Sequence, residues 1–203
     1  MIWRWVFGRQ PKNLHPIMEV QNPPPQAPLT KPRLPTVRFD NSLVTDEIKS
    51  DLRANLRNIS EFRTLPTEAF EPLYAAVETS VSRGRDMAMA ATYILGVGLA
   101  GMTKSRAGEI AASLHNKASA LITREKQLRA GIEYAVWLHS GAPCLLDPQE
   151  SSRADPRLAA AHKAADGKRY RVAEGLAIGG RRTWPQRDGG CKCASRAIVP
   201  GLE

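Results

Sequence analysis

The stretch Gly131-Ile132-Glu133-Tyr134-Ala135-Val136-Trp137-Leu138 decides the fold class, because a helical pattern gives way to a strand there. From Ile132 onward the residues alternate and are rich in aromatic and β-branched types, which is typical of a β-strand. Residues 41–131 carry apolar side chains at helical spacing, and residues 132–203 mix one helical run with short strand-like runs. We therefore expect an α+β fold with three parts: an extended, Pro-rich basic arm over residues 1–40, a helical region over residues 41–131, and a small α+β module over residues 132–203.

Capping signals mark the helices of the helical region. Thr45 precedes two acids, which suit a helix N-terminus, and we expect a first helix from there to about residue 59. Pro66 opens a second helix, which either ends near residues 82–84 or continues to residue 95. Thr103 caps a long helix. The apolar face of that helix consists of Ala107, Ile110, Ala111, Leu114, Ala118, Leu121, Ile122 and Leu128.

The C-terminal module shows shorter patterns. We expect an alanine-rich helix over residues 158–165, which carries His162, and strands over residues 169–172 and 194–199. Residues 140–157 contain three prolines and favour a loop.

The first forty residues favour an extended path. Six prolines fall between Pro23 and Pro35, and proline both removes a backbone donor and pushes its predecessor toward extended conformations. Such a segment builds no core of its own. We therefore expect the aromatic residues Trp3, Trp5 and Phe7 to dock on a partner, since tryptophan is a typical interface residue.

Charge is distributed unevenly along a chain whose formal net charge is +9. The two ends are basic and the middle is close to neutral, which favours a polyanionic partner, although a solvated basic surface is the alternative. Three cysteines make no disulfide framework. No apolar run approaches the roughly 20 residues that span a bilayer, and the N-terminus lacks a secretory signal. We expect no membrane partner and synthesis in a reducing cytoplasm.

Cysteine and histidine near the C-terminus predict a structural zinc site. In an extended segment Cys191 and Cys193 project to the same side, so their sulfurs converge. His162 is the candidate third ligand, and Cys144 or His139 the fourth. Two alternatives remain open: the cysteines are small buried apolar side chains, or they form a redox-active pair.

Catalytic chemistry would have to use the same residues. His162 and Asp166 stand four residues apart, which on a helix would pair them on one face. A zinc-dependent enzyme would need Asp166 or Glu174 as its base, and neither has the spacing of a known metallohydrolase. We therefore expect no enzymatic activity.

Basic residues near the C-terminus are candidates for contact with DNA or with an acidic protein surface. The core of this run combines cations with a tryptophan that could stack, and no base-reading motif accompanies it. Any DNA binding would then be independent of sequence. The candidate residues are Lys168, Arg169, Arg171, Arg181, Arg182, Trp184 and Arg187.

The order of several short motifs resembles the minor head protein, or head-morphogenesis, family of tailed bacteriophages, often called Mu F-like. The resemblance covers roughly residues 100–200. Its motifs are the helix from Thr103 into Ala120-Leu121-Ile122-Thr123-Arg124-Glu125, the strand Gly131 to Trp137, Arg157 with His162, Asp166-Gly167, and a terminal Pro185, Gly189, Cys191 and Cys193.

The resemblance implies a structural role without catalysis. Members of that family join the head in few copies, associate with the portal vertex and in some phages contact packaged DNA. Partners would be the portal, capsid or neck proteins within a larger assembly, and the protein would be made in the bacterial cytoplasm and end in the virion. The proline-rich arm and Cys144 depart from the family's pattern. A head–tail (neck) adaptor is therefore the alternative, and a free nucleic-acid-binding protein is a further one.

Overall fold

The computed structural model of the chain describes residues 39–141, 156–188 and 190–202. The chain divides into two units, Met1–Val37 and Arg38–Glu203. The expected docking residues Trp3, Trp5 and Phe7, and the candidate ligand Cys144, lie outside the described residues. Within the second unit the fold is α+β, as the sequence predicts.

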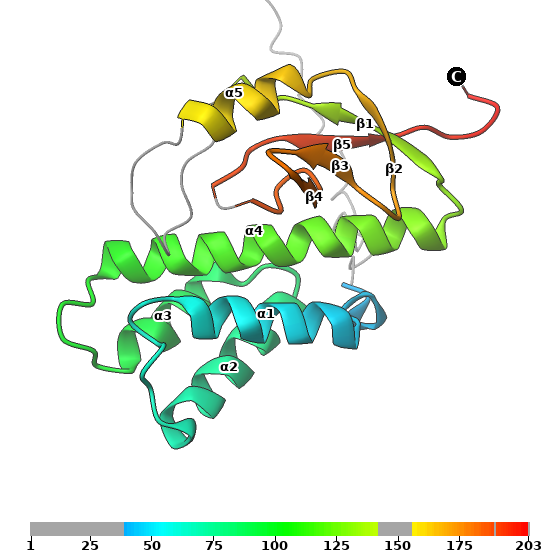
Figure 1. The fold of residues 1–203 in the computed structure, drawn as a ribbon. Helices are drawn as coiled ribbons and strands as arrows, with labels where there is room; N and C mark the ends of the chain where they lie inside the picture. Colours follow the sequence, from blue (N-terminus) through cyan, green and yellow to red (C-terminus); the bar gives the residue numbers. More distant parts are fainter. Residues whose placement is uncertain (1–38, 142–155, 189, 203) are drawn as a thin grey trace, which may run out of the picture. The chain divides into compact units, whose positions relative to one another are not determined.

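Four α-helices follow a short 3-10 helix, η1 (Asn41–Leu43). They are α1 (Asp46–Asn58), α2 (Thr67–Ser82), α3 (Met87–Gly96) and α4 (Lys104–Arg129). The capping predictions are confirmed, because the Thr45 hydroxyl accepts from the Ile48 amide and the Thr103 hydroxyl accepts from the Arg106 amide at 3.1 Å. Figure 1 shows α4 between helices α1 to α3 on one side and the strands on the other.

The boundary between α2 and α3 resolves an alternative that the sequence leaves open. The second helix ends at Ser82, because Gly84 and Arg85 adopt φ values of 82° and 81° that no right-handed helix accommodates. Asp86 then starts α3, and its side chain accepts from the Met89 amide at 3.1 Å. The two helices are therefore separate.

The helices bury one face each in a common core. Leu52 and Leu56 of α1 pack with Phe70 of α2, Ile94 of α3 and Ile110 of α4, and each is at most 2% exposed. A fully buried side chain of this size stabilises the fold by about 1.5–3 kcal/mol relative to an exposed one.

The C-terminal module is built on an antiparallel sheet with the order β2-β1-β5. Its central strand β1 (Tyr134–Leu138) pairs with β2 (Arg169–Arg171) and β5 (Ala194–Ala197), and the helix α5 (Pro156–Ala164) precedes β2. Ala135 and Trp137 of β1 are buried and define the inner face of the sheet. These elements confirm the predicted strands and helix within two residues at each end.

A second, two-stranded sheet was not predicted. β3 (Leu176–Ile178) and β4 (Arg181–Thr183) form a hairpin. Gly179 and Gly180 connect them with φ values of 58° and 82°, a conformation that glycine adopts without strain. The hairpin carries Thr183 into the module's core, where its hydroxyl donates to Asp188.

Trp184 links the two cores. It packs against both the helical core and the core of the module, and its indole N–H donates to the Val172 carbonyl at 2.8 Å. The Arg124 guanidinium of α4 lies 5.0 Å from its ring. Among the described helices, none combines the length and apolar character that crossing a bilayer requires.

Candidate metal centre

His162, Cys191 and Cys193 converge in the core of the module. His162 comes from α5, and the two cysteines lie on the segment that leads into β5. The His162 Nδ1 atom is 3.4 Å from the Cys191 sulfur and 3.8 Å from the Cys193 sulfur. All three potential ligand atoms lie within 4.8 Å of one another, and the residues are 0%, 1% and 0% exposed. This group could hold a metal ion.

The burial pattern explains how a Cys-x-Cys spacing produces this convergence. From Cys191 to Ala197 the side chains alternate between inside and outside, so both sulfurs face the core while Lys192 between them is exposed. The Cys191 amide donates to the Asp188 carbonyl, which closes a tight turn before the cysteines. The Gln186 amide donates to the Cys191 sulfur at 3.4 Å and helps to orient it.

Asp188 fixes the orientation of the histidine. One oxygen of its buried carboxylate accepts from His162 Nε2 at 3.1 Å. Because a carboxylate can only accept, Nε2 carries a proton, and Nδ1 faces the two sulfurs. A carboxylate behind a ligating histidine is the arrangement by which proteins set the tautomer and raise the basicity of a metal ligand.

Two further groups hold the Asp188 carboxylate. Arg181 donates to Oδ1 at 2.6 Å and the Thr183 hydroxyl donates to Oδ2 at 3.2 Å. Burial acts to raise the pKa of Asp188, but the hydrogen bond from His162 and the charge of Arg181 outweigh it and keep the pKa below its usual value. Asp188 is therefore a charged acceptor, and the β3–β4 hairpin is the element that secures it.

The pKa values of the two thiols are shifted in opposite directions. The hydrogen bond with Cys193 and burial raise the pKa of Cys191, whereas the hydrogen bond with Cys191, helped by His162 and Trp137, lowers the pKa of Cys193. The pair therefore favours one thiolate. A divalent cation would displace the second proton as well, because metal-bound thiols are deprotonated.

Trp137 forms one wall of the centre. Its ring meets the His162 ring edge to face, with centroids 5.1 Å apart. Its buried Nε1 has no hydrogen-bond partner of good geometry among the described residues, yet its N–H lies close enough to Cys193 to lower the pKa of that thiol. Trp137 itself is fully buried, so this side of the cluster is closed by an aromatic ring.

Two residues that the sequence offers as possible members of this site, Asp166 and His139, lie elsewhere in the structure. Asp166 is not the partner of His162, because α5 ends at Ala164 and Asp166 instead accepts from the His139 amide at 2.8 Å. His139 is not part of the ligand group, and its Nδ1 accepts from the Gly141 amide at 3.0 Å. The other candidate fourth ligand, Cys144, lies outside the described residues.

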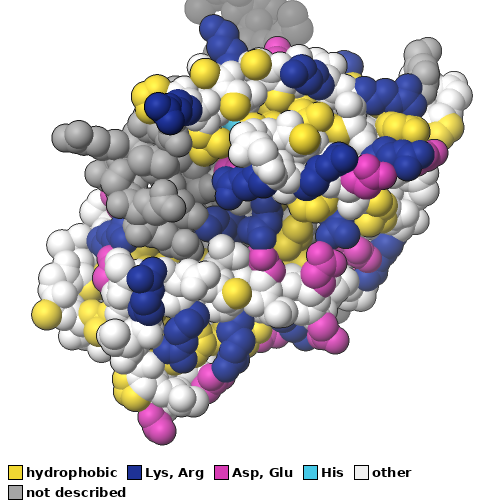
Figure 2. All heavy atoms as spheres, in the orientation of Figure 1, with side chains coloured by type: hydrophobic (Ala, Val, Ile, Leu, Met, Phe, Trp, Pro, Cys, Tyr) yellow, Lys and Arg dark blue, Asp and Glu magenta, His cyan; other side chains and the backbone are white. Residues whose placement is uncertain are grey.

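The basic residues of the C-terminal run separate into different environments. Arg187 forms an ion pair with Asp51 of α1, and Trp184 is packed rather than free to stack. Arg181 donates a hydrogen bond to the Asp188 carboxylate, and Arg182 donates to the Gly175 carbonyl at 3.1 Å. Figure 2 shows Lys and Arg side chains along the hollow between the helices and the module. Much of this run therefore has an internal structural task.

The remaining predicted contact residues lie on β2 and just before it. Lys168 and Arg169 are exposed, and Arg169 stacks on Tyr134 with 3.9 Å between its guanidinium carbon and the ring centroid. Arg171 is also exposed and is paired with Glu174 at 3.2 Å. Arg171 of β2 and Arg182 of the hairpin both pair with Glu174, so these two candidates are neighbours although their strands belong to different sheets.

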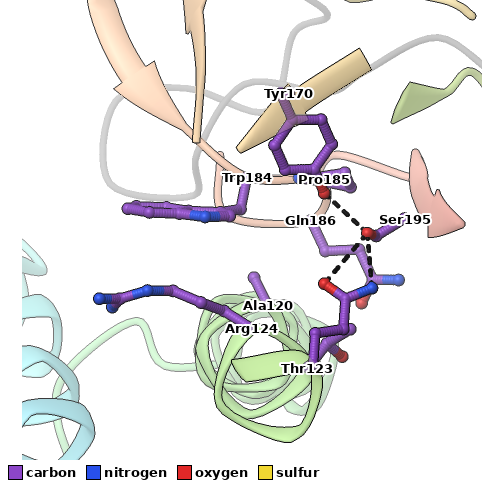
Figure 3. Close-up of a pocket in the computed structure, with 9 residues that line it drawn as sticks. Ala120, Thr123, Arg124, Tyr170, Trp184, Pro185, Gln186 and Ser195 are labelled. Carbon is purple, nitrogen blue, oxygen red and sulfur yellow. Dashed lines mark hydrogen bonds between the residues drawn. The ribbon is translucent and has the colours of Figure 1, made fainter. Parts of the chain in front are cut away.

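A small cavity lies between α4 and the module (Figure 3). Arg124 and Trp184 lie on one side of it, and the Tyr170 hydroxyl bonds Ser195 at 2.7 Å on the other. Its volume of about 20 Å³ has room for a single water molecule. The cavity is therefore a packing feature and no binding site for an organic ligand.

Comparisons with protein-family models, with curated proteins and with solved structures gave no match for this chain. The site is therefore interpreted from its own geometry.

Proposed function

We propose that the chain is a structural component of a tailed-phage head that resides at the portal vertex, with a zinc-stabilised C-terminal module. The observation that carries the proposal is the buried cluster of His162, Cys191 and Cys193. These residues belong to the set on which the resemblance to the minor head family rests. Their assembly into one site supports treating that set as a structural unit and not as a chance series of short motifs.

Enclosure of the cluster favours a structural ion over a catalytic one. Structural zinc sites are closed by protein ligands, whereas catalytic sites keep a position open for water and substrate. The three ligands are at most 1% exposed, and they are packed against Trp137 and the β3–β4 hairpin. This burial supports the expectation that the protein is not an enzyme.

Zinc is the metal that fits these donors best. Two thiolates and one imidazole are soft and borderline ligands, which select zinc over calcium or magnesium. A tetrahedral ion needs a fourth ligand, for which Cys144 is the candidate. When bound, the ion supplies a cross-link between α5 and the segment before β5, and the chain's own residues position it through the Asp188 carboxylate.

The zinc proposal is tested on purified protein. Elemental analysis is expected to find one zinc per chain, retained through gel filtration. A Cys193→Ser variant is expected to lose it, because a neutral hydroxyl replaces a thiolate ligand. A Ser195→Ala variant, changed two residues further along the same strand, provides the control. Protein that is purified without zinc, and whose stability does not rise when zinc is added, would contradict the proposal.

The virion proposal is tested in the phage that encodes the chain. A tagged copy is expected to co-purify with particles and to stay with the portal vertex after the DNA has been removed. Recovery with detached tails would indicate the neck-adaptor role instead. Absence from particles would refute a structural role in the virion.

A further inference from the structure

The outer face of the three-stranded sheet carries a set of cations that the metal centre does not use. Side chains that are directly opposite in an antiparallel pair project to the same face. Val136 of β1 pairs with Arg169 of β2 on one side and with Arg196 of β5 on the other. One row across the sheet therefore reads arginine, valine, arginine, and its two end residues are exposed.

Lys192 extends this row along the third strand. Because Cys191 and Cys193 face inward, Lys192 between them faces the same side as Arg196. Four residues of extended chain separate Lys192 from Arg196 by about 13 Å. The strand spacing places Arg169 about 10 Å from Arg196 across the sheet.

Aromatic stacking holds part of this face in place. Arg169 lies over the Tyr134 ring at 3.9 Å, and Arg171 approaches the same ring at 5.9 Å. Stacking of this kind leaves the edges of a guanidinium free to donate hydrogen bonds. A base that stacked on Tyr134 would have to displace Arg169, so the face is better suited to a phosphate backbone than to bases.

Carboxylates are sparse on this face. Glu133 and Glu174 pair with Arg171 at one end of the sheet. Within the described part of the chain, no ion pair is found for Arg169, Lys192 or Arg196. By contrast, several exposed arginines of the helices have acidic partners, such as Arg53 with Glu71.

We propose that this outer sheet face, formed by Arg169 stacked on Tyr134, Lys192 and Arg196, binds the phosphate backbone of double-stranded DNA. The charges are spaced along about 13 Å of strand, which matches the rise of about four nucleotides in one DNA strand at 3.4 Å each. The evenly spaced phosphates of DNA can pair with this row of cations, whereas an acidic protein would need carboxylates placed at the same spacing. Recognition is independent of base sequence, because the contacts are to phosphates.

The test measures binding of the full-length protein to a fluorescent 20-base-pair duplex as a function of salt. Removing Arg169 and Arg196 together by R169A/R196A is expected to lower the affinity at least about ten-fold in low salt and to reduce the slope of log K against log salt by about two. The matched control is R63A/R83A, which removes the same charge from the ends of the helical layer. It is expected to change the slope by less than about half a unit.

Each other result overturns the proposal. Equal effects of the two double variants would mean that net charge alone drives binding. Displacement of the duplex by polyglutamate as readily as by unlabelled DNA would assign the face to an acidic protein. Failure of the wild-type protein to bind at about 50 mM salt would exclude the site altogether.

Because the residues of both double variants are exposed, the fold should survive the substitutions. The variant R169K/R196K keeps the charge and is expected to restore most of the salt slope. The measurement needs no phage, so its failure is separable from failure of the virion proposal.

Discussion

Replacing Asp188 by asparagine tests whether the buried cluster is a metal centre with an oriented histidine. The substitution keeps the size of the side chain and removes its charge. Its carboxylate accepts from His162, Thr183 and Arg181, so an amide would place an N–H₂ group against at least one existing donor. The His162 ring would then lose the acceptor that keeps Nδ1 aimed at the sulfurs.

The expected loss can be estimated from these contacts. Removing the carboxylate behind a ligating histidine lowers metal affinity about 10- to 100-fold, which corresponds to about 1.4–2.7 kcal/mol. The lost ion pair with Arg181 contributes less to stability, since that arginine is 63% exposed and water screens the pair to within about 1 kcal/mol. The free energy of zinc binding should therefore become less favourable by more than the free energy of unfolding of the zinc-free protein decreases.

Competition with a chromophoric chelator at fixed pH measures the affinity, and urea unfolding of the zinc-free protein measures the stability. Asp166→Asn is the matched control, because Asp166 is exposed and caps the end of β1 instead of contacting His162. A zinc affinity for Asp188→Asn within about two-fold of wild type would refute the role of Asp188. An equal loss in both variants would refute its specificity.

Three further predictions concern the whole fold. Burial, followed by the charge of Arg85, lowers the pKa of His115 to about 4. Between about pH 6.5 and pH 4 the unfolded state therefore binds a proton at this histidine that the folded state does not bind. Stability should be complete above pH 6.5 and fall by about 3 kcal/mol as the pH drops to 4, and urea unfolding of His115→Gln should lack this slope. Gly175→Ala should lower the free energy of unfolding by at least about 2 kcal/mol, since φ is 76° and a Cβ would lie 2.6 Å from the Thr183 carbonyl oxygen. Gly179→Ala is the control, because a Cβ there would have no atom within 4 Å, and it should lower the free energy of unfolding by only about 1 kcal/mol. Thermal unfolding measures both. Chelation of zinc should expose the amides of β1 and β2 to hydrogen exchange while α4 stays protected; equal exchange in both layers would contradict a local role for the ion.

Local signals were sufficient for most helices. Thr45 and Thr103 lie where a side-chain oxygen can accept from the helix's first amides, and this chemistry depends only on neighbouring residues. The end of α2 was ambiguous because the apolar pattern continues into α3. Only the positive φ angles at Gly84 and Arg85 separate the two helices, and arginine carries no sequence signal for such a conformation.

The hairpin of β3 and β4 was missed although a signal was present. Each strand has three residues, too few for an alternating pattern to be recognised, but the Gly179-Gly180 pair is a typical two-residue hairpin connection.

The three candidate metal ligands can be recognised in the sequence, but the residue that orients them cannot. Cysteine and histidine are common metal ligands, so the sequence alone indicates His162, Cys191 and Cys193 as candidates. Asp188 lies 26 residues from His162 and meets it only because the hairpin and the following turn fold back on α5. Asp166 does not pair with His162, because the i+4 rule holds only inside a helix and α5 ends two residues before Asp166.

The position of Trp184 has a consequence for how genes that encode such chains can recombine. Its ring is part of two cores at once, and one of them depends on α4. A crossover near residue 132 would deliver the sheet and the cluster of His162, Cys191 and Cys193 to a new host protein without the helix surface that covers this tryptophan. We expect viable mosaics to exchange α4 together with the C-terminal strands, so that breakpoints fall before Thr103 and not at the start of β1.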